Sequence, residues 1–225
     1  MIVTALVLLG GLMLLSLPVA AALGLLGLAL SEIYAFLPLH RGIAQMAWNA
    51  GNDSVLLAVP MFILLGEVLL RSGMAERMYG AMVPWLSWLP GGLMHSNIGA
   101  CTLFAATCGS SVATAATIGT VALDQAQRYG YNERLFLGTI AAGGTLGILI
   151  PPSINMIVYG ALTNSSIPQL YLAGFLPGFL LAFLFMVTTW IACRLRPEWG
   201  GRKVETSWGD RIRVLPDLLP PLLIF

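Results

Sequence analysis

Residues 107–114 place one glycine among several hydroxyl side chains, in the order Thr-Cys-Gly-Ser-Ser-Val-Ala-Thr. They lie within residues 78–123, a stretch that contains no Asp, Glu, Lys or Arg. In the hydrocarbon of a membrane, a helix break is tolerated only where protein or water satisfies the freed backbone groups. A polar turn in the middle of such a stretch therefore predicts a site for a small ligand or an ion.

A second interruption follows at residues 143–153, where glycines precede the pair Pro151-Pro152. Two adjacent prolines remove two backbone donors and disfavour helix just before them. Hydroxyls and freed carbonyls are hard oxygen ligands, which suit Na⁺ in unwound transporter helices. The candidate ion- and substrate-binding residues are Gly109, Ser110, Ser111, Thr114, Gly144, Thr145, Gly147, Pro151, Pro152, Ser153 and Asn155. Within this set the Na⁺ candidates are Gly109, Ser110, Ser111, Gly144 and Thr145.

Two interpretations of these small residues stay open. Gly, Ala, Ser and Thr are also enriched wherever membrane helices pack closely, so the run from Ala113 to Thr120 could be only a packing face. Asn155 could contact a substrate or merely satisfy freed backbone. A proton relay would need Asp, Glu or His close to either break, and the sequence has none there, which favours Na⁺ over H⁺.

The composition indicates an all-α integral membrane protein. The 225 residues are 58% hydrophobic and 9% charged, with a mean hydropathy of +0.86. Soluble domains carry about 25% charged residues. A net charge of +1 gives no reason to expect a nucleic-acid partner. The three cysteines lie in apolar segments without metal-ligand spacing, so no cofactor is expected.

The apolar pattern predicts a single membrane domain over 1–225. Residues 92–128 hold two helices of only about 17 residues each, the lower limit for crossing a bilayer, which favours a re-entrant hairpin. Gly109 is expected to close the first of these helices in the left-handed conformation, and Ser110 or Ser111 to cap the second. The expected elements are transmembrane helices over 1–30, 54–70 and 170–193, an interfacial amphipathic helix over 74–89, the hairpin over 92–128, a broken helix over 133–163, a cytoplasmic loop over 194–213 and the start of another transmembrane helix over 214–225.

Charge predicts the orientation. With a hairpin at 92–128, the loops 71–91, 128–134 and 194–213 share one side and hold ten of the eleven Lys and Arg residues, with Arg41 alone on the other. The positive-inside rule then places these loops in the cytoplasm, as in a bacterial inner membrane. If both helices of 92–128 crossed the membrane completely, the same loops would still lie on the same side. The charge distribution alone therefore does not establish that the hairpin is re-entrant.

The sequence resembles the large membrane subunit of the tripartite ATP-independent periplasmic (TRAP) transporters. The resemblance is carried by VPMFILLGEVLLRSGMAERMY (59–79), LPGGLMHSNIGACTLFAATCGSSVATAATIGTVAL (89–123) and YNERLFLGTIAAGGTLGILIPPSINMIVYGALTNSSI (131–167). The Gly-Ser-Ser turn and the Pro-Pro break occur in the family's order. The family's large subunit continues through a second hairpin and a second broken helix, so the chain resembles its N-terminal half.

The resemblance implies a Na⁺-driven, elevator-type secondary transporter and not an enzyme. A periplasmic substrate-binding protein would deliver an organic anion, often a C4-dicarboxylate or sialic acid, and a small membrane subunit would brace the scaffold. On that basis the tip at Gly109, Ser110 and Ser111 and the break from Gly144 to Pro152 would bind Na⁺ and face the substrate. The alternatives are another Na⁺/anion elevator family and a membrane scaffold subunit that does not transport.

Glu67 lies inside the predicted span 54–70. An intramembrane carboxylate invites a functional interpretation. Arg71, however, follows four residues later on the same helix face, so a local ion pair is the favoured interpretation.

Overall fold

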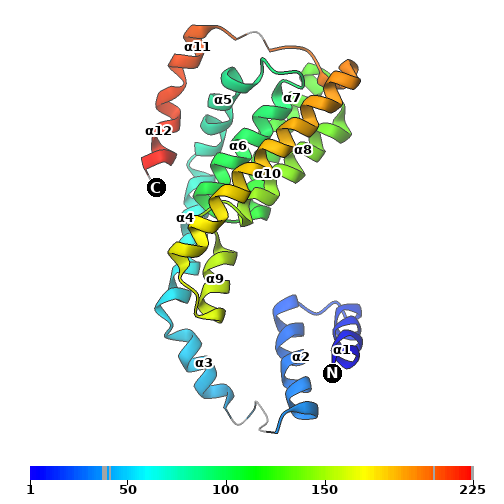
Figure 1. Cartoon of the computed structure of the whole chain (residues 1–225), viewed down its shortest axis with the longest axis vertical. Helices are drawn as coiled ribbons and strands as arrows, with labels where there is room; N and C mark the ends of the chain where they lie inside the picture. Colours follow the sequence, from blue (N-terminus) through cyan, green and yellow to red (C-terminus); the bar gives the residue numbers. More distant parts are fainter. Residues whose placement is uncertain (37–39, 41, 205, 224–225) are drawn as a thin grey trace. The chain divides into compact units, whose positions relative to one another are not determined.

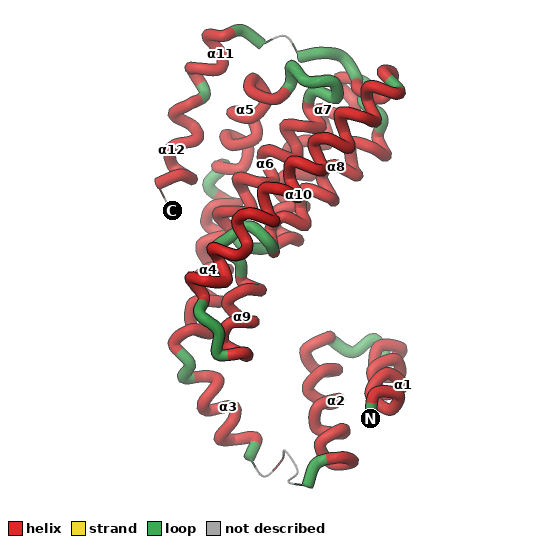
Figure 2. The backbone as a smooth tube through the Cα atoms, viewed as in Figure 1, coloured by secondary structure: helices red, strands yellow, loops and turns green. Residues whose placement is uncertain are grey.

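The fold is known from a computed structural model that describes the chain except residues 37–39, 41, 205 and 224–225. Arg41, on which part of the orientation argument rests, therefore lies outside the described residues. All regular structure in the described part is helical, as Figure 2 shows. The chain divides into two compact units, 1–54 and 55–225, which are described separately.

The first unit contains α1 (Ile2–Leu14), α2 (Val19–Tyr34) and α3 (Ile43–Gly51). The structure differs here from the single kinked helix expected over 1–30. Ser16 has φ 55°, and Pro18, which lacks a backbone donor, precedes the first turn of α2. The chain therefore turns back, and the hydroxyls of Thr4 and Tyr34 meet at 2.6 Å.

The second unit contains the two predicted breaks. Its helices and 3-10 turns are α4 (Ser54–Arg71), α5 (Met74–Leu86), α6 (Leu93–Cys108), α7 (Ser111–Tyr129), α8 (Glu133–Thr145), η2 (Leu146–Ile148), α9 (Ile154–Thr163), α10 (Ile167–Leu195), η3 (Pro197–Gly200), α11 (Trp208–Arg213) and α12 (Leu215–Leu223). The segment 194–213, expected as a loop, thus includes η3 and α11. A capping box between Ser207 and Asp210 closes the first turn of α11 and gives it a local reason to form.

Two helices are long and apolar enough to cross a membrane by length and composition. They are α4, with 18 residues and a mean hydropathy of 2.0, and α10, with 29 residues and 2.2. About 20 apolar residues span the hydrocarbon core. The Glu67–Arg71 pair predicted for α4 is present, with Arg71 Nε 2.7 Å from Glu67 Oε1.

Helix α6 lies at the centre of the second unit, between α5, α7, α8 and α10 (Figure 1). Almost every residue of α6 is buried, which explains why the helix has no separate solvent-facing polar side. The core around it includes Met78 of α5, Phe104 of α6, Ile118 of α7 and Phe136 of α8. The hairpin is therefore held by packing on several sides. Its membrane placement, and that of α5 in an interface, stay predictions.

A buried hydrogen-bonded chain ties three of these helices together. The Tyr79 hydroxyl donates to Asn97 Oδ1 at 3.0 Å, and Asn97 Nδ2 donates to Thr139 Oγ1 at 3.0 Å. A buried polar group costs stability unless it is hydrogen-bonded. This network therefore stabilises the one register of α5, α6 and α8 in which all three side chains are paired.

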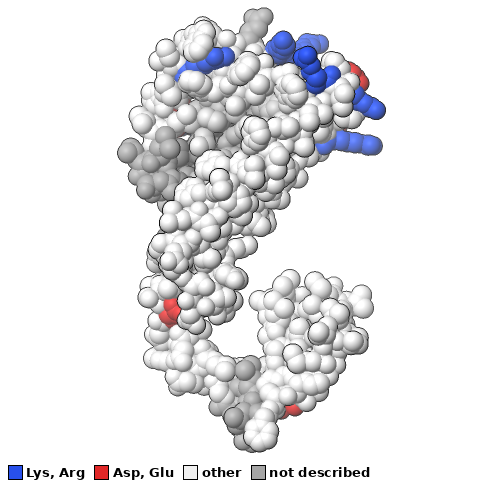
Figure 3. All heavy atoms as spheres, in the orientation of Figure 1, with Lys and Arg blue, Asp and Glu red and all other residues white. Residues whose placement is uncertain are grey.

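Positive charge gathers at one end of the second unit. Figure 3 shows Lys and Arg side chains at the end where α10 finishes, while the length of the helices below is almost free of charge. This end holds the residues that connect α7 to α8 and α10 to α11, because Asn132 N donates to Trp199 O and Arg202 N donates to Tyr129 O. Two loops predicted to share one side of the membrane are thus in contact.

Candidate functional site

The hairpin tip, defined here as residues 109–111, is a tight turn with local capping. Helix α6 ends at Gly109, whose φ of +62° is the left-handed conformation that glycine adopts without strain. Ser110 caps α7, because its Oγ accepts from Ala113 N at 3.4 Å. Both features match the expectation from sequence, with Ser110 and not Ser111 as the cap.

The helix break, defined as residues 146–153, separates α8 from α9. The 3-10 turn η2 follows α8, the Pro151-Pro152 peptide bond is cis, and α9 begins at Ile154. Ser153 is fully buried and its hydroxyl donates to Ile148 O at 2.7 Å. The Ser153 hydroxyl therefore satisfies a carbonyl within the break.

The tip and the break pack directly against each other through their backbones. Ile154 N donates to Gly109 O at 3.4 Å. A Cβ added at Gly147 would lie 2.6 Å from Ser110 O, and one added at Gly109 would lie 2.6 Å from Pro152 O. Contacts this short leave no room for a side chain. The two interruptions, which are far apart in sequence, thus form one junction.

Two further glycines bring α8 against the hairpin helices. A Cβ at Gly144 would lie 2.6 Å from Ala115 Cβ on α7, and one at Gly143 would lie 2.9 Å from Cys101 on α6. Gly144 therefore acts at least as a packing residue. Whether its carbonyl also binds an ion stays a prediction.

The candidate hydroxyls differ in what they already bind. Thr114 is buried and donates to Ser110 O at 2.7 Å, while Thr145 is exposed and donates to Ala142 O at 2.6 Å. A hydroxyl that donates to its own helix still has lone pairs for a cation. Ser111 is half-buried beside the tip. The hydroxyl oxygens of Ser110, Ser111 and Thr145 are therefore the better placed candidate ligands.

Ser111 and Thr145 share an open groove of about 550 Å³ between α7 and α8. Its remaining lining consists of small or apolar residues: Val112, Ala115, Ala116, Ala141 and Gly144. Small-molecule sites usually measure about 300–1,000 Å³, so the groove is of suitable size. Asn155 lies exposed on the first turn of α9 and does not line this groove.

Sequence reasoning missed three residues that support the tip from behind. A Cβ at Gly66 of α4 would lie 3.2 Å from Cys108 Cβ, and Cys108 Sγ lies 3.3 Å from Thr114 Oγ1. Cys101 fills the space beside Gly143. The only signal in the sequence was their small size. Within the described residues, no three His, Cys, Asp or Glu side chains are grouped so that they could hold a metal ion.

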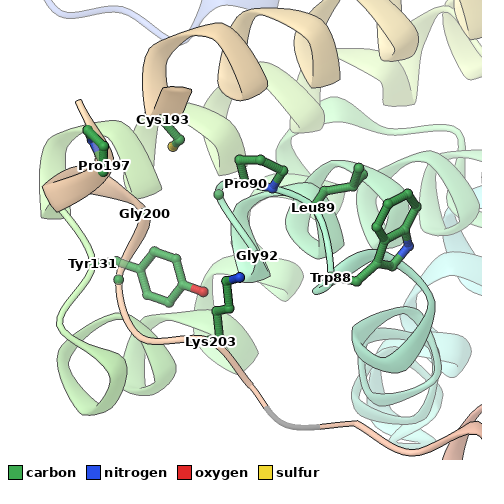
Figure 4. Close-up of a pocket in the computed structure, with 11 residues that line it drawn as sticks. Trp88, Leu89, Pro90, Gly92, Tyr131, Cys193, Pro197, Gly200 and Lys203 are labelled. Carbon is green, nitrogen blue, oxygen red and sulfur yellow. The ribbon is translucent and has the colours of Figure 1, made fainter. Parts of the chain in front are cut away.

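The opposite end of the hairpin contains a partly open cavity of about 180 Å³, here called the base cavity (Figure 4). Its wall is made by the α5–α6 turn, Tyr131, the end of α10 and the segment after it: Trp88, Leu89, Pro90, Gly91, Gly92, Tyr131, Cys193, Pro197, Gly200, Gly201 and Lys203. The Tyr131 hydroxyl accepts from Leu93 N at 3.0 Å. Burial raises the pKa of Tyr131, so the phenol is neutral at physiological pH.

An all-helical, largely apolar chain with a polar-tipped hairpin packed on a broken helix has the features of a membrane permease. The chain belongs to the DctM component family of the Tripartite ATP-independent periplasmic transporters, which it matches over residues 6–225. The resemblance seen in the sequence is thereby confirmed. This family is a class of transporter permeases, which is not an enzyme class.

Curated relatives show the same relationship. The C4-dicarboxylate TRAP transporter large permease protein DctM of Vibrio cholerae serotype O1 is 35% identical over 210 residues, 88% of this chain and 46% of that protein. The ectoine TRAP transporter large permease protein TeaC of Halomonas elongata is 32% identical over 218 residues, 94% of this chain and 49% of that protein. The sialic acid TRAP transporter permease protein SiaT of Haemophilus influenzae is 38% identical over 141 residues, 63% of this chain and 23% of that protein. The chain spans about half the length of the first two relatives.

Proposed function

We propose that the chain supplies the first hairpin and broken helix of a TRAP-type permease that couples Na⁺ entry to uptake of an organic solute. Family membership supports the class of protein. The substrates that give these three relatives their names, C4-dicarboxylate, ectoine and sialic acid, all contain a carboxylate. A carboxylate-bearing solute is therefore the proposed cargo, and Na⁺ is the proposed co-transported ion.

The junction of the hairpin tip with the helix break carries this proposal. It gathers the carbonyls of Gly109 and Pro152 and the hydroxyls of Ser110 and Ser111 at a place without charged side chains. Charge is expensive at the membrane centre, whereas neutral oxygens bind Na⁺ without that cost. The N-terminal end of α7, with its partial positive charge and the Ser111 hydroxyl beside it, suits the solute carboxylate.

The wider assembly is proposed on the same basis. The family is described as one component of a tripartite periplasmic transporter, which supports a periplasmic substrate-binding protein and a small membrane subunit as partners. In an elevator mechanism the hairpin and broken helix move as one body. Their direct backbone contact supports this role. The basic end of the second unit is proposed to face the cytoplasm of a bacterial inner membrane.

The test is Na⁺-specific stabilisation of the complete gene product in detergent. Thermal unfolding midpoints are measured in NaCl and in choline chloride at equal ionic strength, since a bound ion raises the midpoint by mass action. We expect Ser111→Ala to raise by about fivefold the Na⁺ concentration that gives half of the maximal rise in the midpoint. This is the change in affinity that the loss of one contact of about 1 kcal/mol implies. The matched control is Thr188→Ala on α10, whose hydroxyl donates to Phe185 O away from the tip.

Two outcomes would contradict the proposal. The first is a wild-type midpoint that is the same in NaCl and choline chloride. The second is an equal Na⁺ response in wild type and Ser111→Ala, together with intact Na⁺-dependent uptake in proteoliposomes. The second outcome is the one that a non-transporting scaffold, or a packing role for the Gly-Ser-Ser run, requires.

A further inference from the structure

The base cavity contains a cation that the transport site does not use. Figure 4 shows the Lys203 side chain pointing toward the turn that carries Gly92, beside Tyr131. The backbone donors at this turn are already engaged, because Leu93 N donates to the Tyr131 hydroxyl and Met94 N to Gly91 O. The attraction of the cavity for an anion therefore comes chiefly from the Lys203 ammonium. Lysine acts toward phosphate as a mobile point charge.

An apolar groove on α10 lies next to this cavity. Leu89 lines both the cavity and the groove. The other residues that line the groove are His95, Phe183, Met186, Val187 and Trp190, and its volume is about 200 Å³. We call it the α10 groove. His95 joins the two spaces, because its Nε2 bonds Pro90 O at 2.9 Å.

The surroundings are positively charged and rich in tryptophan. The segment 194–213 holds six basic and three acidic residues. Trp88 at the cavity is 63% exposed, and Trp190 in the groove is 42% exposed. Tryptophan side chains favour the level of lipid headgroups, and basic residues near a membrane attract anionic lipids by about 1 kcal/mol each.

We propose that the base cavity and the α10 groove together bind one anionic phospholipid. Its phosphate lies at Lys203 in the cavity, and one acyl chain lies along Phe183, Met186 and Trp190 in the groove. The charge of Lys203 complements the headgroup, and the apolar groove complements the chain. This inference rests on the membrane placement of the proposed function, although not on Na⁺ coupling.

The apolar groove next to the cavity is what favours a phospholipid over free phosphate. An inorganic anion would occupy only the cavity and would gain nothing from Phe183 or Trp190. A zwitterionic lipid would fill the groove equally well but would gain less from Lys203. The two halves of the site therefore make separate contributions, which separate substitutions can remove.

The test is native mass spectrometry of the complete gene product with phosphatidylglycerol or phosphatidylcholine added in equal amounts. We expect wild type to retain phosphatidylglycerol preferentially. Lys203→Gln is expected to weaken phosphatidylglycerol binding by about fivefold and to abolish the preference, as loss of one charge contact implies. Its control, Arg202→Gln, removes a neighbouring exposed charge that does not line the cavity.

The groove is tested separately. Phe183→Ala is expected to weaken binding of both lipids, whereas Phe179→Ala, which removes an exposed ring of α10 outside the groove, leaves binding unchanged. Inorganic phosphate at 100-fold excess over lipid is not expected to displace phosphatidylglycerol. Thermal midpoints verify that each variant is folded.

Three results would overturn the inference: no preference for phosphatidylglycerol in wild type, equal losses in Lys203→Gln and Arg202→Gln, or displacement of the lipid by inorganic phosphate. Na⁺ stabilisation measured on the same samples keeps the two proposals apart. Absence of lipid binding with an intact Na⁺ response would contradict only the proposed lipid site. Lipid binding without a Na⁺ response would contradict only the proposed Na⁺ coupling.

Discussion

The two ends of the α6–α7 hairpin are built in different ways. At the tip, Gly109 and Ser110 meet the helix break through backbone atoms, with no space for a side chain at Gly147. At the base, the contacts are made by side chains: the Tyr131 hydroxyl holds Leu93 N, and Lys203 enters the cavity beside it. A backbone-built site presents carbonyls in fixed positions, whereas a side-chain-built site presents charge.

This difference has a consequence for mutations. The tip should be sensitive to added atoms, because an extra methyl group has nowhere to go. The base should be sensitive to removed atoms, because its contacts end in one hydroxyl or one ammonium. Substitutions of each kind at each end therefore test whether the comparison is correct.

The largest expected effect is that of Gly147→Ala. The new Cβ would lie 2.6 Å from Ser110 O and 2.8 Å from Ser111 N, so the tip and the break must separate. Overpacking of this kind costs about 1–3 kcal/mol. We expect Na⁺-dependent uptake by the complete gene product in proteoliposomes to fall by at least about tenfold, since a displaced tip loses ligands that bind the ion.

Gly138→Ala is the matched control for this prediction. Gly138 lies on α8, the helix that precedes the turn η2 in which Gly147 lies, and a Cβ there would meet nothing within 4 Å. Alanine also favours helix over glycine by up to about 1 kcal/mol, so Gly138→Ala should be neutral or stabilising. Equal uptake by the Gly147→Ala and Gly138→Ala proteins would show that the tip and the break do not act as one site.

Local chemistry explains what the sequence predicted here. Gly109 is left-handed and Ser110 caps α7, because both preferences are set by a residue and its immediate neighbours. The Pro151-Pro152 pair likewise breaks the helix through missing donors. These features need no information about the rest of the chain.

Contacts between distant segments could not be predicted in the same way. Nothing in the sequence around Gly144 and Gly147 says that α7 lies against them, so both were expected as ligands while their crowding was not foreseen. The network of Tyr79, Asn97 and Thr139 was missed for the same reason. The division of α1 from α2 was missed because Pro18 suggested a kink, whereas Ser16 turns the chain.

The next largest effect belongs to the base. Tyr131→Phe removes the acceptor of Leu93 N and leaves a buried donor unpaired, which costs about 1–3 kcal/mol. We expect a lower thermal midpoint with no change in the Na⁺ concentration needed for half of the stabilisation. A shifted Na⁺ response would show that the base contributes to ion binding and that the two ends are not separate.

The same residue gives a pH dependence. Burial raises the pKa of Tyr131 above the ordinary 10.0, so the folded state holds the phenol proton more tightly than the unfolded state does. The stability linked to Tyr131 is therefore complete below pH 10 and is lost as the pH rises above it. Unfolding midpoints of wild type and Tyr131→Phe should converge only as the pH rises above 10, and a difference that stays constant there would contradict this.

The two ends of the hairpin can also be compared through the stability that one helix cap contributes at each. Asn132 Oδ1 accepts from Leu135 N at 3.1 Å at the base, whereas Ser110 Oγ accepts from Ala113 N at 3.4 Å at the tip. The shorter bond should be worth more, so we expect Asn132→Ala to cost about 1 kcal/mol and Ser110→Ala about 0.5 kcal/mol in urea unfolding. The order should reverse for Na⁺ dependence, because only Ser110 lies at the proposed ion site.

The smallest expected effect is that of Glu67→Gln, which examines whether the tip works with neutral groups alone. Glu67 follows Gly66, the residue of α4 that packs on Cys108 behind the tip, yet its carboxylate pairs with Arg71 at 2.7 Å. Their side chains are 48% and 80% exposed, so the pair should contribute less than about 0.5 kcal/mol. We expect the variant to keep its thermal midpoint, and its Na⁺ response to match that of Arg71→Gln, which removes the other member of the same pair. A large loss of Na⁺ dependence in Glu67→Gln alone would mean that a carboxylate takes part in ion binding, and the division between a neutral tip and a charged base would then be wrong.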